Sequence, residues 1–144
     1  MIQLNTFNIS RCRVLSKRKL KKAVTSILRS FAIDNTELSI VFATDKEIKV
    51  LNKAYRMRGV PTDVLSFSMR EGKRVANDSG MLGDIVISVD RAKAQAKIFG
   101  TSFRREMELY IIHGVLHLLG YDDEEPAAEK KMRKKERELL DIVF

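Results

Sequence analysis

The segment that ends at Leu119 is the most apolar part of the chain, and it most constrains the fold. A helix capped by Thr101 or Ser102 and running through Leu119 would carry apolar side chains on nearly every side. Such a helix is stable in water only when other elements bury it. We therefore expect a central buried helix with the rest of the chain packed around it.

The only two histidines of the chain, His113 and His117, lie four residues apart on this predicted helix. Positions i and i+4 share one helix face with side chains about 5–6 Å apart, so both imidazoles can reach one metal ion. Gly120 can end the helix in a left-handed conformation and return the chain, which brings Asp123 in as a third ligand. His113, His117 and Asp123 are therefore the predicted ligands of an open site. The alternative is a pair of core histidines, each with its own buried partner.

The hydrophobic patterns around this helix predict four strands and four further helices. Strands are expected at 2–9, 37–43, 64–67 and 84–88, and helices at 17–31, 45–55, 89–99 and 126–142. The last strand is apolar enough to be central, and the last two strands could form an antiparallel hairpin around a mobile loop at 70–80. We expect an α+β fold: one domain over residues 1–144, with a small mixed sheet of about four strands packed with about five helices.

Charge and composition narrow the function. Hydrophobic residues make up 44% of the chain and charged residues 32%, which is typical of a globular protein and excludes disorder. No apolar run is long enough to span a membrane, no signal peptide is visible, and the single Cys12 fits a reducing compartment, so we expect a cytoplasmic protein. We also expect a monomer. The net charge of +8 favours a polyanionic partner such as RNA, although the basic clusters at 11–22 and 130–137 could be solvated helix faces.

Beyond these patterns, the run HGVLHLLGYDD at 113–123 resembles the signature of the YbeY family of bacterial rRNA-maturation endoribonucleases. The resemblance extends to 51–56, 61–67 and 82–88 in the family's order and spacing, and it covers nearly the whole chain. It implies an α+β fold with the metal in a cleft beside the sheet. It also implies metal-dependent cleavage of single-stranded RNA in 16S rRNA processing and ribosome quality control, with the small ribosomal subunit and ribosome-associated proteins as partners.

The chain departs from this signature at Asp123, where the family has a third histidine. Ligation by Asp123 would give a set of two imidazoles and one carboxylate, which suits Mn²⁺ or Fe²⁺ as well as Zn²⁺. The alternative is that the shorter side chain leaves a weak site. We expect ligation, and one divalent ion with Zn²⁺ favoured.

Two residues are predicted to be catalytic. Arg56 matches the family's arginine in the Asn-x-x-Tyr-Arg block, and a guanidinium can hold two phosphate oxygens at once; the alternative is an arginine exposed at a helix end. His113 is assigned a catalytic role beside its role as a ligand. Asp63, in a turn, and Ser66 border the expected cleft, and Asp84 is a candidate hydrogen-bond partner for a ligand histidine.

Two other functions stay open at this point. The spacing of the site is also that of metzincin peptidases, which carry a glutamate base directly after the first histidine. Gly114 occupies that position here, so a zinc peptidase-like metallohydrolase would need a different base. The chain could also be a non-catalytic ribosome-assembly factor with a structural or decayed metal site, an interpretation that Asp123 keeps open.

Overall fold

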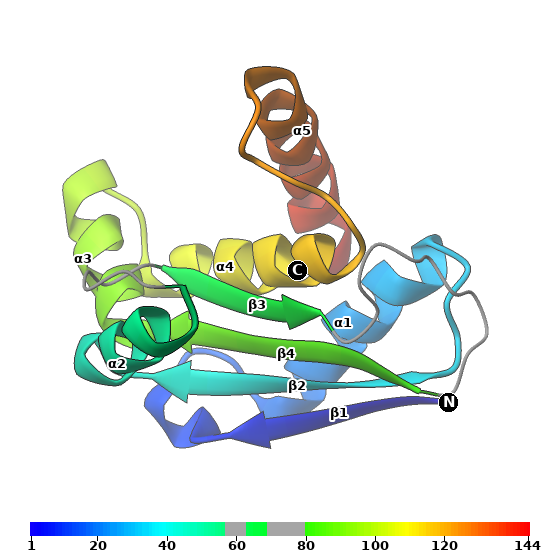
Figure 1. Ribbon diagram of the computed structural model, residues 1–144, viewed down its shortest axis with the longest axis horizontal. Coiled ribbons are helices and arrows are strands. Elements are labelled where there is room, and N and C mark those ends of the chain that lie inside the picture. The colour runs from blue at the N-terminus through cyan, green and yellow to red at the C-terminus, as the bar shows by residue number, and fades with distance from the viewer. Residues whose placement is uncertain (57–62, 69–79) are drawn as a thin grey trace.

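A four-stranded mixed sheet forms the base of the structure, a computed structural model that describes residues 1–56, 63–68 and 80–144, without the side chains of Tyr55 and Arg56. The strands lie in the order β1-β2-β4-β3 (Figure 1). They are β1 (Ile2–Phe7), β2 (Thr36–Ala43), β3 (Val64–Ser68) and β4 (Met81–Ser88). Strands β1, β2 and β4 run parallel, and β3 pairs antiparallel with β4. The predicted hairpin and the interior position of β4 are therefore confirmed.

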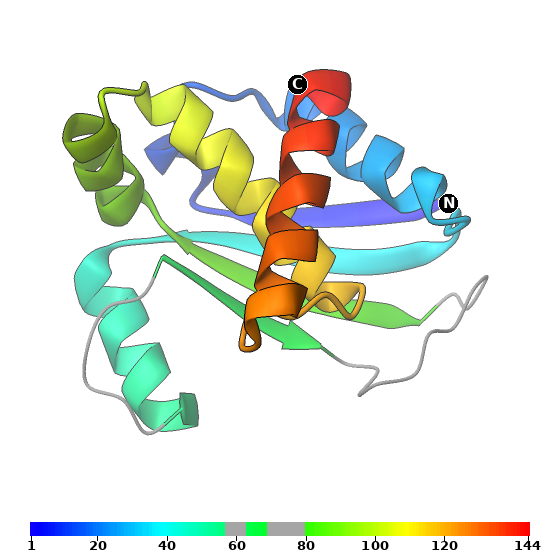
Figure 2. The same cartoon turned by 90° about the horizontal axis from the view of Figure 1, so that it is seen from above.

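Five α-helices accompany this sheet within the described residues, and they complete the expected α+β fold. They are α1 (Lys17–Ser30), α2 (Asp45–Arg56), α3 (Val89–Phe99), α4 (Phe103–Leu118) and α5 (Pro126–Val143). Helix α4 contacts β3 and β4, with α1 and α3 beside it, and α5 packs on its outer side (Figures 1 and 2). No helix in the described residues is long and apolar enough to cross a membrane.

Local capping signals begin the helices where the sequence predicts them. Ser16 caps α1 and Ser102 caps α4; each side-chain oxygen accepts a hydrogen bond from the backbone N–H three residues later. Thr44 and Glu47 exchange side-chain bonds to each other's backbone N–H groups, which is a complete capping box at the start of α2. The first strand ends earlier than expected because Asn8 adopts a left-handed conformation with φ of 60°.

Helix α4 is the buried centre of the molecule, as predicted. Five of its apolar side chains are fully inaccessible to solvent: Met107, Ile111, Ile112, Val115 and Leu116. A second cluster on the other face of the sheet packs α2 against it through Ala43, Ile48, Leu65 and Val86. The turn expected at 58–62, and nearly all of the loop expected at 70–80, lie outside the described residues.

Candidate metal centre

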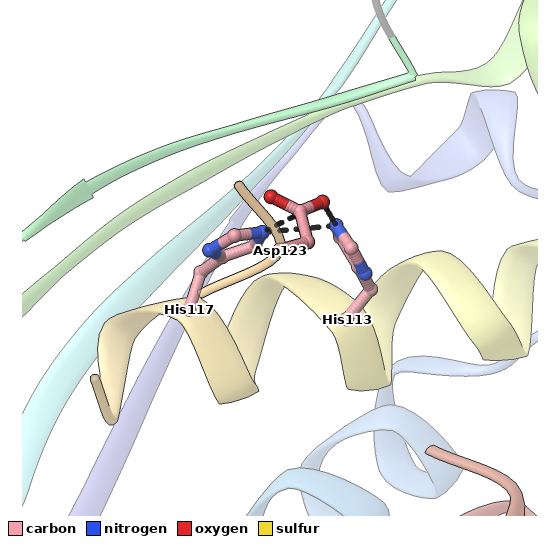
Figure 3. Close-up of side chains that lie close together, drawn as sticks. All are labelled: His113, His117 and Asp123. Atoms are coloured by element: carbon pink, nitrogen blue, oxygen red, sulfur yellow. Dashed lines mark hydrogen bonds and ion pairs between the residues drawn. The ribbon is translucent and has the colours of Figure 1, made fainter. Parts of the chain in front are cut away.

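The three predicted ligands come together at the carboxyl end of α4 (Figure 3). His113 and His117 project from one face of the helix, and their Nε2 atoms are 3.0 Å apart. Asp123, in the loop between α4 and α5, places Oδ2 3.8 Å from each of these nitrogens. The histidine side chains are 28% and 27% exposed and that of Asp123 is 43% exposed, so an ion or a substrate can approach from solvent.

The end of α4 returns the chain toward the histidines. Gly120 has φ of 99°, a conformation that side chains with a Cβ rarely adopt. The Gly120 N–H donates to the carbonyl of His117 and the Tyr121 N–H to that of Leu116, the bond pair that closes a helix with a left-handed residue. This reversal places Asp123 beside the last helical turn, as the sequence predicts.

Each histidine has a partner that fixes its ring. Nδ1 of His113 lies 2.6 Å from Oε2 of Glu136 on α5, and His117 has a hydrogen bond to the backbone of Tyr121. We assign the Nδ1–H tautomer to both rings from these contacts, because it leaves both Nε2 lone pairs directed toward one point. Two bare nitrogens 3.0 Å apart repel each other, and a cation held between them and Asp123 relieves that repulsion. The donor set therefore fits one divalent ion.

The electrostatics of His117 favour the metal-binding form of its ring. Burial lowers the pKa of His117 below its ordinary value, and the neighbouring His113 lowers it further, against an opposing effect of Asp123. A lowered pKa keeps the imidazole neutral near neutral pH, and the neutral ring is the form that binds metals. Acid protonates the His117 ring, so affinity for the ion should fall as the pH falls through the lowered pKa of this group.

Glu136 was not predicted as part of the site. Its side chain is 14% exposed, and it lies four residues after buried Met132 and three before buried Leu139. The one available signal was therefore a carboxylate on the buried face of an amphipathic helix. Asp84, the partner suggested from the sequence, lies on β4 opposite Phe67 of β3. The carboxylate that contacts His113 Nδ1 is that of Glu136.

We expect Glu136→Gln to weaken Zn²⁺ binding about 10–100-fold, because a hydrogen-bonded carboxylate raises the basicity of a ligand histidine and orients its ring. Competition with a chromophoric chelator measures the change. Glu138→Gln is the matched control, since Glu138 is an exposed acid on the same helix that pairs with Lys135. Equal affinities for the two variants would show that Glu136 does not support the ligand.

A cleft of about 420 Å³ opens beside the centre. Its lining joins both histidines and Asp123 to Asp63, Ser66 and Ser68 at or just before β3, and to Arg133 on α5. Ser66 Oγ lies 3.3 Å from the carbonyl of Gly114 and donates to it, which holds β3 against α4. The structure thus brings Asp63 and Ser66 to the ligands and places the centre in a cleft beside the sheet, as expected. Arg56 is the last residue of α2, and its side chain lies outside the described residues.

Gly114 faces the sheet and not the cleft. A Cβ built on this residue would lie 2.6 Å from Cγ2 of Ile85 on β4. A glutamate side chain at this position, where metzincin peptidases carry their base, would therefore start against Ile85 of the sheet and point away from the cleft. Glycine has no side chain that could act as the base of such a peptidase, and this position faces away from the cleft.

Both the sequence and the fold of this chain match known proteins. A family model described as endoribonuclease YbeY matches residues 5–143. The endoribonuclease YbeY of Lysinibacillus sphaericus is 47% identical over 73% of this chain and 71% of its own length. The endoribonuclease YbeY of Aquifex aeolicus is 42% identical over 92% of this chain and 84% of its own length. The solution structure of a Thermotoga maritima protein aligns with a TM-score of 0.70 at 28% identity, covering 99% of this chain and 89% of that one.

Proposed function

The chain belongs to the YbeY family of endoribonucleases involved in rRNA maturation, and on this basis we propose that residues 1–144 form one YbeY-like domain that cleaves single-stranded 16S rRNA. We place its action in the cytoplasm, as a monomer, on the small ribosomal subunit and in ribosome quality control with ribosome-associated proteins. The observation that carries the chemistry is the three-ligand group of His113, His117 and Asp123 in the wall of an open cleft.

The metal ligands in the proposal are His113, His117 and Asp123, with Zn²⁺ favoured and Mn²⁺ or Fe²⁺ compatible with the carboxylate. When bound, the ion supplies a Lewis acid for a phosphate oxygen and lowers the pKa of a bound water. Arg133, whose side chain is 65% exposed, lines the same cleft and supplies positive charge for a phosphate. Arg56 is proposed as a catalytic residue that binds the reacting phosphate, and His113 as a ligand with a catalytic role.

The test of this function is cleavage of a labelled single-stranded RNA by the purified protein, with and without a chelator and with an equal duplex RNA as control. We expect cleavage of the single strand that the chelator stops and that added Zn²⁺ or Mn²⁺ restores. Absence of cleavage with any added metal would favour the assembly-factor interpretation. Cleavage of a peptide substrate in place of RNA would favour the peptidase interpretation, which the buried direction of Gly114 already opposes.

Arg56→Glu should abolish RNA cleavage and leave the metal content intact, because the change removes a phosphate-binding guanidinium without touching a ligand. The initial cleavage rate and the bound metal per protein measure the two effects. Lys49→Glu, an exposed charge reversal on the same helix, is the matched control for the general loss of positive charge. Similar rates for the two variants would remove Arg56 from the catalytic set.

Asp123→His should raise the affinity for Zn²⁺, because it replaces a carboxylate with the softer imidazole that Zn²⁺ binds well. Titration against a competing chelator measures the affinity before and after the change. Asp122→His, at the exposed neighbouring position, controls for adding a histidine to this loop. An unchanged affinity in Asp123→His would mean that the side chain at 123 does not ligate.

A further inference from the structure

A second cavity, of about 220 Å³, adjoins the metal centre on the side of α5. His113 and Asp123 line both this cavity and the cleft, so a group bound in it would lie next to the ligands. The remaining walls come from Asp63 and Val64 at the start of β3, from α4 and from α5. We call it the α4–α5 cavity and use six of its residues: Asp63, Glu106, Leu109, Tyr110, Met132 and Glu136.

Hydrogen-bond acceptors dominate the polar part of the α4–α5 cavity. Glu106 is only 7% exposed, and one of its oxygens accepts from Thr101 at 2.9 Å. One oxygen of Asp63 accepts from Arg91 Nε at 3.2 Å, and one oxygen of Glu136 contacts His113. Each carboxylate therefore has a second oxygen that these contacts do not use. Leu109 and Met132 supply apolar walls between them.

Tyr110 supplies an independent sign that a ligand belongs here. The residue is 8% exposed, and its buried hydroxyl oxygen lies beside the carboxylate of Asp63 but forms no hydrogen bond of standard distance and angle with any described residue. Burial raises the pKa of Tyr110, and the carboxylates of Asp63 and Glu106 raise it further, which places the hydroxyl at the acidic wall of the cavity. A buried polar group without a partner is costly, and a bound acceptor would relieve that cost.

We propose that the α4–α5 cavity binds one nucleobase of the RNA, next to the phosphate at the metal centre, and that it selects bases with an exocyclic amino group. The inference rests on the proposed ribonuclease function. Cytosine, adenine and guanine offer amino N–H donors to the carboxylates, and a ring nitrogen or carbonyl that accepts from Tyr110. Uracil presents a carbonyl oxygen where cytosine has its amino group, so a carboxylate would repel it.

The charge of the α4–α5 cavity favours binding of a nucleobase over binding of the phosphate backbone. Arg133 lines both spaces and pairs with Glu129 at 2.9 Å, but Glu106, Glu129 and Glu136 line the α4–α5 cavity and not the cleft. Phosphates are therefore repelled more strongly from the cavity than from the cleft. A neutral base with donors is attracted by the same carboxylates. A second divalent cation would also be attracted by them, but Leu109, Met132 and a neutral phenol are poor surroundings for an ion that demands oxygen ligands.

The experiment measures binding of free nucleosides to the metal-loaded protein by NMR titration, because nucleosides cannot be cleaved and carry no phosphate. We expect cytidine and adenosine to bind at least about tenfold more tightly than uridine. Tyr110→Phe should weaken cytidine and adenosine by roughly 3–10-fold without lowering the melting temperature, since it removes an unsatisfied hydroxyl. Glu106→Gln should reduce the preference, whereas Glu108→Gln, an equally buried acid on α4 that pairs with Arg104, should not.

Each outcome decides the proposal. Equal binding of all nucleosides, no binding at the highest soluble concentration, or a preference that Tyr110→Phe and Glu106→Gln leave unchanged would overturn it. Binding of added Mn²⁺ that Glu106→Gln abolishes, without nucleoside binding, would make the cavity a cation site. The ribonuclease function is tested separately: it is wrong if the wild-type protein cleaves no RNA. Selective nucleoside binding by a protein that cleaves no RNA would support the base-binding cavity and reject only the ribonuclease function.

Discussion

His117→Ala should release the metal ion and lower the rate of RNA cleavage by about 10³-fold or more, because the Lewis-acid contribution of a bound ion is several kcal/mol and each 1.4 kcal/mol is tenfold. His117 supplies one of two nitrogens at 3.0 Å separation, and its loss leaves His113 and Asp123 as an incomplete pair. Metal analysis of the purified protein and the initial rate on a single-stranded RNA measure the two effects.

The variant should remain folded, which makes this result interpretable. The His117 side chain is 27% exposed, so truncation opens no closed cavity in the core. Asp122→Asn is the matched control: it alters the exposed acid beside a ligand and preserves the oxygen that accepts from the Glu124 N–H. Full metal content and full activity in His117→Ala would end the metal-site interpretation, and equal losses in both variants would point to a disturbed loop.

Gly83→Ala should lower the free energy of unfolding by about 3 kcal/mol, the sum expected from overpacking and backbone strain. A Cβ at this position would lie 2.4 Å from the backbone oxygen of Phe67 and 2.7 Å from Cδ2 of Leu118. A backbone atom cannot rotate away, so β3 would have to separate from β4. Urea denaturation of the two proteins measures the difference from the midpoint and the slope.

Gly114→Ala is the internal comparison for this prediction. Its added Cβ would lie 2.6 Å from Ile85, but the contacted atom belongs to a side chain that can adjust, and alanine favours a helix more than glycine does. We expect a loss of about 1 kcal/mol for this variant. A smaller loss for Gly83→Ala than for Gly114→Ala would contradict the close approach of Gly83 on β4 to the backbone of β3 and to the end of α4.

The features that sequence alone predicted correctly depend on residues close together in the chain. Ser16 and the Thr44–Glu47 pair bond to N–H groups within three residues, so local chemistry decides where α1 and α2 begin. The antiparallel β3–β4 pair joins strands that follow one another along the chain. His113 and His117 share a helix face by spacing, and Gly120 closes the helix and returns the chain to them.

What only the tertiary structure decided are the contacts between segments distant in the chain. Nothing near Glu136 in the sequence indicates that its carboxylate meets His113, because that contact depends on how α5 packs across α4. The parallel neighbours β2 and β4 are likewise far apart in sequence, and side-chain alternation does not encode which parallel strand lies next to which.

The contrast is sharpest at Asp63 and Tyr110. In the sequence, Asp63 lies in a predicted turn, and Tyr110 lies 47 positions later on the predicted central helix. Packing of α4 beside β3 puts both in one cavity at the metal ligands. The grouping of His113, His117 and Asp123 was therefore determined by helical periodicity and one glycine. The contact of His113 with Glu136 and the adjoining cavity were determined by the packing of α4, α5 and the sheet. Burial of apolar faces is non-directional, so only the complete fold fixes which polar groups it brings together.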